Sequence, residues 1–341
     1  MHRPRQRRSR LTLNHAAQCA WSVLCAFALS VALPGPARAQ EPASGATEVS
    51  TAAIATPSLP TSAATSAAGP ALSASATAEP PKTAAAQVGK LSLDRQVRWL
   101  SRAARSGTLA KMNDAALVSL FQSLDPLALP RYLKDGPNGY PSYEFTMLRR
   151  ERIDGRWPDQ PDHMLVRVTR DPMRVYAKWL PDGDHAGQEI LYDETTRPDE
   201  MLGHLGGLLN VVTLWTALDG SLARSQSRHS IRDLGTEFIT QQFLAEGTKF
   251  ADAGVTRANN IEVKTIDGAR VVAFTYETPF GQPQFYAKKE VLGLDLRRPY
   301  FRTAESFDND GNIFESIVFQ NIAPMVFDDN TFSPKNPEYK F

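Results

Sequence analysis

Among the residue types that can carry out chemistry, the histidines are the best candidates for a functional site in this sequence. Four of them lie beyond residue 40: His163, His185, His204 and His229. No two are spaced as His-x-His or His-Glu-x-x-His, so the sequence carries no metal-binding signature. His229 directly precedes an apolar helical pattern and is the one possible polar site that we single out, although a structural hydrogen bond is the commoner role for an isolated histidine. We therefore predict no metal site, no cofactor and no catalytic residue.

Other nucleophiles and ion sites are also poorly represented. The chain contains neither Gly-x-Ser-x-Gly nor Ser-x-x-Lys, although a triad assembled from distant residues with His229 stays open. Asp308 begins an Asp-Asn-Asp-Gly run that lacks the other positions of a calcium loop, and a hairpin turn explains it better. Cys19 and Cys25 both precede a predicted signal cleavage site. The exported chain would then have no thiol nucleophile, disulfide or thiolate metal site.

Residues 1–39 have the three parts of a secretory signal peptide. A basic start with five arginines is followed by an apolar run over 20–33 and by Ala37-Arg38-Ala39, a small-x-small cleavage site. No later segment approaches the ~20 apolar residues of a membrane span. We therefore predict cleavage near Ala39, a periplasmic location and no transmembrane span. The signal holds six of the 38 Lys and Arg and none of the 37 Asp and Glu, which leaves 32 against 37, a net charge of −5 that disfavours nucleic acid as a partner.

Composition divides the rest of the chain in two. Residues 40–90 are rich in Ala, Ser, Thr and Pro and bury too little apolar surface to fold, so they are predicted to be a disordered linker. Residues 91–341 are long enough for one domain. It opens with two amphipathic helices within 91–135, where Leu93, Val97 and Leu100 form the first apolar stripe.

From Tyr143 the hydrophobic period changes from helix to strand. Tyr143, Phe145 and Met147 alternate with polar residues, and similar runs follow up to residue 192 and again over 261–266, 271–276, 284–291, 300–307 and 313–319. Eight or nine strands without intervening helices indicate an antiparallel arrangement. The predicted fold class is α+β, mainly β: a strongly curved, open half-barrel sheet with helices on its concave face.

The central segment 201–250 is unusually apolar. It combines a glycine-rich run with a predicted helix over 231–249 whose apolar pairs lie on adjoining stripes. This helix either caps the core of the sheet or covers a hydrophobic pocket, and we favour the pocket because the apolar face exceeds what capping requires. The candidate hydrophobe-binding residues are Leu208, Leu209, Val212, Leu214, Trp215, Leu234, Phe238, Ile239 and Phe243.

The arginines of the first strands allow two interpretations. Arg149, Arg150 and Arg152 would meet Arg167 and its neighbours if the first two strands pair. Ion-paired residues on the strands are the default interpretation, and an anionic headgroup site is the alternative.

Several short segments follow one another in an order that resembles a known family. The closing Asn336-Pro337-Glu338-Tyr339 run is the most specific of them. The chain resembles an exported bacterial family named domain of unknown function fifteen seventy-one, which is similar to the LolA/LolB/RseB lipoprotein-carrier superfamily. The matching segments are 143–145, 149–151, 175–180, 206–209, 220–223, 228–235, 307–311 and 332–341.

The resemblance implies an open LolA-like half-barrel that shelters acyl chains, and it implies no catalytic residues. We therefore predict a non-enzymatic periplasmic carrier for a lipid, acyl chain or lipoprotein-like hydrophobe. An envelope-stress sensor that binds a partner protein is the first alternative, and a periplasmic hydrolase that uses His229 is the second.

Overall fold

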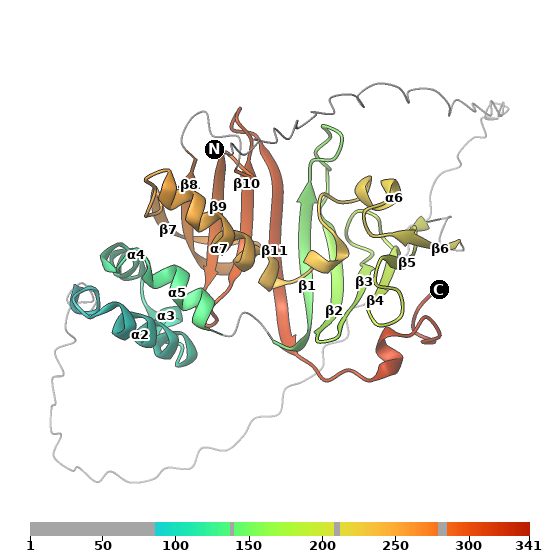
Figure 1. The fold of residues 1–341 in the computed structure, drawn as a ribbon, viewed down its shortest axis with the longest axis horizontal. Coiled ribbons are helices and arrows are strands. Elements are labelled where there is room, and N and C mark those ends of the chain that lie inside the picture. The colour runs from blue at the N-terminus through green and yellow to red at the C-terminus, as the bar shows by residue number, and fades with distance from the viewer. Residues whose placement is uncertain (1–85, 137–139, 208–211, 279–284) are drawn as a thin grey trace, which may run out of the picture. The chain divides into compact units, whose positions relative to one another are not determined.

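An eleven-stranded antiparallel sheet dominates the structure, a computed structural model that describes residues 86–136, 140–207, 212–278 and 285–341 (Figure 1). The strand order is β6-β5-β4-β3-β2-β1-β11-β10-β9-β8-β7, so β6 and β7 form two separate edges and the sheet is open. The predicted fold class is confirmed. The strands are β1 (Ser142–Glu151), β2 (Asp162–Arg170), β3 (Met173–Trp179), β4 (Glu189–Asp193), β5 (Glu200–His204), β6 (Thr213–Ala217), β7 (Asn260–Ile266), β8 (Ala269–Glu277), β9 (Lys289–Asp295), β10 (Phe301–Phe307) and β11 (Ile313–Pro324).

The two halves of the sheet meet at the pairing of β1 with β11. Strands β1 to β6 run outward from this centre, and β7 to β11 return to it from the other edge. In the register of the central pair, Glu151 lies opposite Glu315. On the other side of β1, Arg149 lies opposite Asp162 of β2. This register places charged residues that are distant in the sequence side by side.

The period of two in the sequence predicts the strands where one face is buried. In β1 alternate residues are buried, among them Tyr143, Phe145 and Met147. The alternation fails for β9, which is buried along almost its whole length. The sequence predicts this strand over 284–291. In the structure it covers Lys289–Asp295 and therefore ends later in the chain than predicted.

The central segment contributes to the sheet as well as to its cover. It supplies the edge strands β5 and β6, followed by α6 (Ser221–Arg224), the 3₁₀ turn η2 (Ile231–Asp233) and α7 (Thr236–Asp252). These two strands raise the total above the predicted eight or nine. Each has five residues, and β6 is largely exposed, which removes the alternation that marks a half-buried strand.

The N-terminal region folds into α2 (Leu93–Arg105), α3 (Thr108–Lys111), α4 (Asp114–Ser123) and α5 (Ala128–Asp135). These are four helices where the sequence predicts two. Gly107, with φ +73°, separates α2 from α3, and the Asn113 side chain caps α4 by accepting a hydrogen bond from the Ala116 N–H. Before them, residues 86–89 form a helical turn whose Val88 is buried in the core.

One large core joins these helices to the inner face of the sheet, and α7 lies over β9 to β11 in it (Figure 1). Phe243 of α7 meets Phe301 with ring centroids 5.1 Å apart. A smaller cluster includes Tyr176 of β3, on which Tyr339 of the C-terminal segment stacks at 3.8 Å. None of the helices in the described ranges has the length and apolarity that a membrane crossing requires.

Candidate functional site

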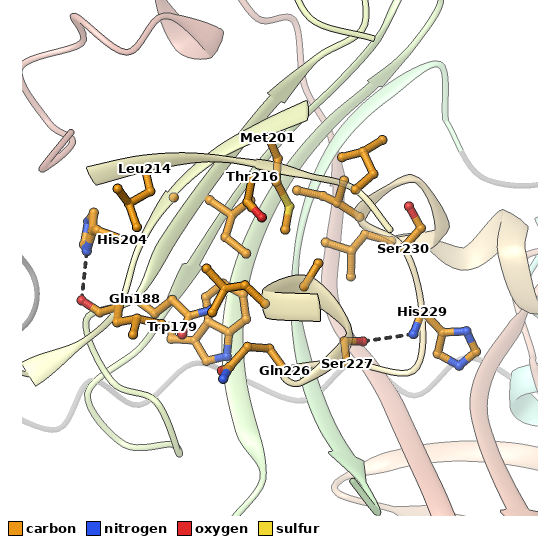
Figure 2. Close-up of a pocket in the computed structure, with 18 of the residues that line it drawn as sticks. Trp179, Gln188, Met201, His204, Leu214, Thr216, Gln226, Ser227, His229 and Ser230 are labelled. Carbon is orange, nitrogen blue, oxygen red and sulfur yellow. Dashed lines mark hydrogen bonds between the residues drawn. The ribbon is translucent and has the colours of Figure 1, made fainter. Parts of the chain in front are cut away.

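A cavity of about 290 Å³ lies between the edge strands and the segment that follows them (Figure 2). Residues of strands β1 to β6 and of the loops beside them form one part of its wall, and α6 together with residues 226–234 forms the rest. Its surface is mainly aliphatic, which suits a ligand that is itself apolar. The apolar residues of the wall are Met164, Trp179, Ile190, Met201, Leu205, Val212, Leu214, Leu218, Leu222, Ala223, Ile231 and Leu234.

Four buried polar atoms of residues in this wall lack a hydrogen-bond partner within the described part of the chain: Arg149 Nε, Trp179 Nε1, Gln188 Oε1 and His204 Nε2. His204 Nδ1 lies 3.1 Å from the Leu205 carbonyl, which can only accept, so in the neutral ring Nδ1 carries the hydrogen and Nε2 is an acceptor. Burying polar groups without partners is costly. The wall therefore offers two donors, Arg149 Nε and Trp179 Nε1, and two acceptors to a ligand.

The structure brings four of the predicted site residues to the cavity: Val212, Leu214, Leu234 and the polar candidate His229. Trp215 follows Leu214 on β6 and is not among the residues of the cavity wall. Its ring is 41 % exposed and lies 4.2 Å from the Arg197 guanidinium. The predicted residues Leu208 and Leu209 lie outside the described residues.

The predicted residues of α7 lie elsewhere. Phe238, Ile239 and Phe243 pack against β9 to β11, and the space left between them and the sheet is only about 10 Å³. A gap of this size holds at most one water molecule. Helix α7 therefore caps the core, and the cover of the cavity is formed by α6 and the residues that follow it.

His229 belongs to a buried polar cluster next to the cavity. Its Nε2 is hydrogen-bonded to Glu315 Oε1 and lies 3.9 Å from Glu151 Oε1. Its backbone N–H donates to Ser227 Oγ at 3.1 Å (Figure 2). Burial disfavours the charged imidazole, but the hydrogen bond to Glu315 and the negative charges of Glu315 and Glu151 outweigh it and raise the pKa of His229.

Arg149 also contributes to the cavity wall. Its side chain is buried, and the carboxylates of Asp162 and Glu151 balance its charge. Its guanidinium donates to Asp162 at 2.9 Å and lies 3.4 Å from Glu151. Arg152 is ion-paired with Asp308 at 2.7 Å and Arg167 with Glu144 at 2.9 Å, whereas Arg150 donates to the backbone carbonyl of Asp159. The default interpretation of ion-paired, solvent-facing strand residues is wrong for Arg149, because this residue is buried, but its two carboxylate partners mean that it is not a free anion site.

The chain belongs to the family described as Protein of unknown function (DUF1571), whose sequence profile matches residues 140–341. This confirms the family resemblance of the short segments. The matched region contains the whole sheet, the cavity and the cluster around His229. No curated protein matches the chain.

Among solved structures, the chain is similar to an uncharacterized conserved protein from Thermus thermophilus, with 10 % identity over 62 % of this chain and 93 % of that one and a TM-score of 0.34. It is similar to the MucA/MucB complex structure from Pseudomonas aeruginosa, with 13 % identity, coverage of 60 % and 58 %, and a TM-score of 0.31. A LolA superfamily protein from Nitrosomonas europaea shows 10 % identity, coverage of 62 % and 97 %, and a TM-score of 0.25.

Proposed function

We propose that this member of the DUF1571 family is a non-enzymatic periplasmic carrier that holds an acyl chain or similar hydrophobe in the cavity beside β5, β6 and α6. The observation that supports it is the aliphatic wall around about 290 Å³ of space. An engineered apolar cavity of ~150 Å³ already binds benzene. At ~0.8 kcal/mol per buried methylene, about six methylenes contribute roughly 5 kcal/mol before ordering costs.

The polar atoms of the wall narrow the chemistry of the ligand. Trp179 Nε1 can donate to a carbonyl oxygen, and Gln188 Oε1 and His204 Nε2 can accept from an N–H or O–H group. Arg149 is neutralised by Asp162 and Glu151, so it does not select a free acid. We infer a ligand with an apolar chain and a neutral polar group, such as an acyl amide or a hydroxylated lipid.

A cavity-filling variant tests this proposal. Ala223 of α6 lies in the wall, so Ala223→Trp places an indole where the ligand would lie. The matched control is Ala251→Trp, at an exposed position of α7. We expect native mass spectrometry of protein purified from its own periplasm to show a bound lipid, and the affinity for a fluorescent acyl probe to fall at least tenfold in Ala223→Trp and to be unchanged in Ala251→Trp.

Two other results would replace the proposal. Absence of a bound lipid, with equal probe binding by both variants, would favour the module that binds a partner protein. Hydrolysis of an acyl ester that is abolished by His229→Asn in a protein that still folds would favour the hydrolase.

A further inference from the structure

The cluster around His229 gathers several buried carboxylates close to one another. Glu151, Glu290 and Glu315 are all buried, and the buried cation beside them, Arg149, is shared with Asp162. Buried carboxylates are costly unless a cation is close to them.

Three ligand atoms converge in this cluster. One oxygen of Glu151, one nitrogen of His229 and one oxygen of Glu315 all lie within 4.8 Å of one another. They come from three separate parts of the chain: the end of β1, the segment before η2 and the start of β11. The register that sets Glu151 opposite Glu315 brings the two carboxylates together, and His229 approaches them from the residues before η2.

The outer oxygen of the Glu315 carboxylate is already held by neighbours. Glu315 Oε2 lies 3.3 Å from the hydroxyls of Tyr286 and Ser306, both of which can donate to it. Glu315 Oε1 then faces His229 Nε2. Such outer contacts orient the ligands of protein metal sites.

The two carboxylate oxygens of Glu151 also face different neighbours. Its Oε1 faces His229 Nε2 at 3.9 Å, and its Oε2 lies 3.4 Å from Arg149 Nη1. The Glu151 side chain is only 3 % exposed, yet Oε2 accepts no hydrogen bond from any residue that the structure describes. Glu151 Oε1 accepts a hydrogen bond from the Arg228 backbone N–H at 3.2 Å, so the open hydrogen-bonding capacity of this carboxylate is at Oε2.

We propose that Glu151, His229 and Glu315 form a binding site for a divalent cation of the zinc class. An imidazole nitrogen with two carboxylate oxygens suits Zn²⁺, whereas Mg²⁺ and Ca²⁺ prefer oxygen ligands alone. At bond lengths of ~2.1 Å, tetrahedral ligand atoms stand ~3.4 Å apart, so closure of the site needs side-chain shifts of about 1 Å.

The cation would take its fourth ligand from outside this set. Tyr286 Oη lies 3.3 Å from His229 Nε2, and His229 also borders the cavity. Zinc sites with three protein ligands usually keep their fourth position for water or another small ligand.

Metal titration of the full mature chain tests the site. After dialysis against EDTA, we expect ZnCl₂ to bind at one equivalent in isothermal titration calorimetry and to raise the melting temperature. Glu151→Gln and Glu315→Gln should each weaken binding at least tenfold, because each removes a charged ligand with little change of shape. His163→Asn is the matched histidine control, since His163 is hydrogen-bonded to Asp182 outside the cluster, and it should bind Zn²⁺ as the unchanged protein does.

A spectroscopic readout keeps the test independent of the stability of the variants. Co²⁺ added to the unchanged protein should produce visible absorption of four- or five-coordinate cobalt, and ZnCl₂ should remove it. Absence of Co²⁺ absorption together with Zn²⁺ binding weaker than 100 μM would overturn the proposal. Equal loss of Zn²⁺ affinity in His163→Asn and Glu315→Gln would overturn it too.

Discussion

Charged residues at inward positions of strands are the residues of this protein that carry most chemical information. In β1 the buried phase runs from Tyr143 through Met147 to Arg149 and Glu151, so a charged pair occupies positions that the pattern assigns to the core. Such a break in the pattern is visible in the sequence. It could have identified Arg149 and Glu151 as a buried charged pair, although the sequence-based prediction placed Arg149 only in a possible basic patch and did not single out Glu151.

The partners of these residues cannot be read from the sequence. Glu315 stands 86 positions beyond His229, and only the register of β1 with β11 sets it beside Glu151. The same holds for Trp179, Gln188 and other buried polar residues of the cavity wall, whose open hydrogen-bonding capacity appears only once the strands are assembled.

A pH dependence of stability follows from the pair of His185 and Asp162. The hydrogen bond to Asp162, aided by the charges of Asp162 and Asp184, raises the pKa of His185 against the effects of burial and of Arg149. The protonated imidazole therefore stabilises the folded chain below the ordinary histidine pKa of ~6.5, and this contribution is lost as the pH rises through the raised value.

His185→Asn tests this dependence, because Asn tolerates the φ of +53° at this position. Urea unfolding should show a larger stability difference between the unchanged protein and the variant at pH 5.5 than at pH 9. A difference that is the same at both pH values would contradict the assignment.

At the scale of elements, periodicity predicts the strands that have one buried face and misses those that do not. β1 and β2 alternate and stand where the sequence places them, whereas β9 is buried on both faces and β6 is mostly exposed. The apolar excess of the central segment was informative about a cavity. Which element covers that cavity depends on packing, and α6 takes the place that the sequence suggested for α7.

Alanine substitutions at Phe243 and Leu214 should distinguish a residue of the core from a residue of the cavity wall. Phe243→Ala should cost ~3–5 kcal/mol of unfolding free energy, because its ring is buried against Phe301 and Tyr276. Leu214→Ala should cost well under ~1 kcal/mol, since the side chain is 52 % exposed, and should weaken acyl-probe binding several-fold. Urea unfolding and probe titration measure both quantities, and a reversed pattern would contradict the assignment of the two elements.

Two glycines of the α7 region should respond in opposite ways to a methyl group. A Cβ at Gly235, where φ is +132°, would lie 1.9 Å from Arg170 and 2.5 Å from the Tyr143 hydroxyl. Gly235→Ala should therefore destabilise the protein by ~1–3 kcal/mol. A Cβ at Gly247 in the helix meets no atom of the described residues within 4 Å, so Gly247→Ala should stabilise by ~0.5–1 kcal/mol. Thermal unfolding of the two variants measures both shifts, and equal effects would refute the argument.

At the scale of the whole molecule, composition and alternation predict an antiparallel sheet but not its strand order. The central pairing of β1 with β11 joins residues more than 150 positions apart, and it depends on the return of the second half of the sheet to the first. Family membership rests on the match of the family profile to residues 140–341. The signal peptide over 1–39 and the disorder of residues 40–85 stay predictions, whereas residues 86–89 at the end of the predicted linker form a helical turn with Val88 in the core.

The Ala-, Ser-, Thr- and Pro-rich composition of residues 41–85 predicts that they contribute nothing to the stability of the domain. Their deletion keeps Val88, which is buried in the core. The melting temperature of the deleted chain should lie within about 2 °C of the full mature chain in differential scanning calorimetry, because 1 kcal/mol shifts the melting temperature of a domain of this size by ~2–4 °C. A fall of ten degrees or more would show that the segment packs against the domain.

Photo-crosslinking tests the central claim, a ligand held in the cavity beside β5, β6 and α6, most directly. A fatty-acid amide that carries a diazirine in its chain is bound to the mature protein, irradiated and located by peptide mass spectrometry. The account predicts labels on residues of the cavity wall within 188–205 and 212–234, with Ala223→Trp abolishing them. Labels confined to other surfaces, or an unchanged yield in Ala223→Trp, would contradict it.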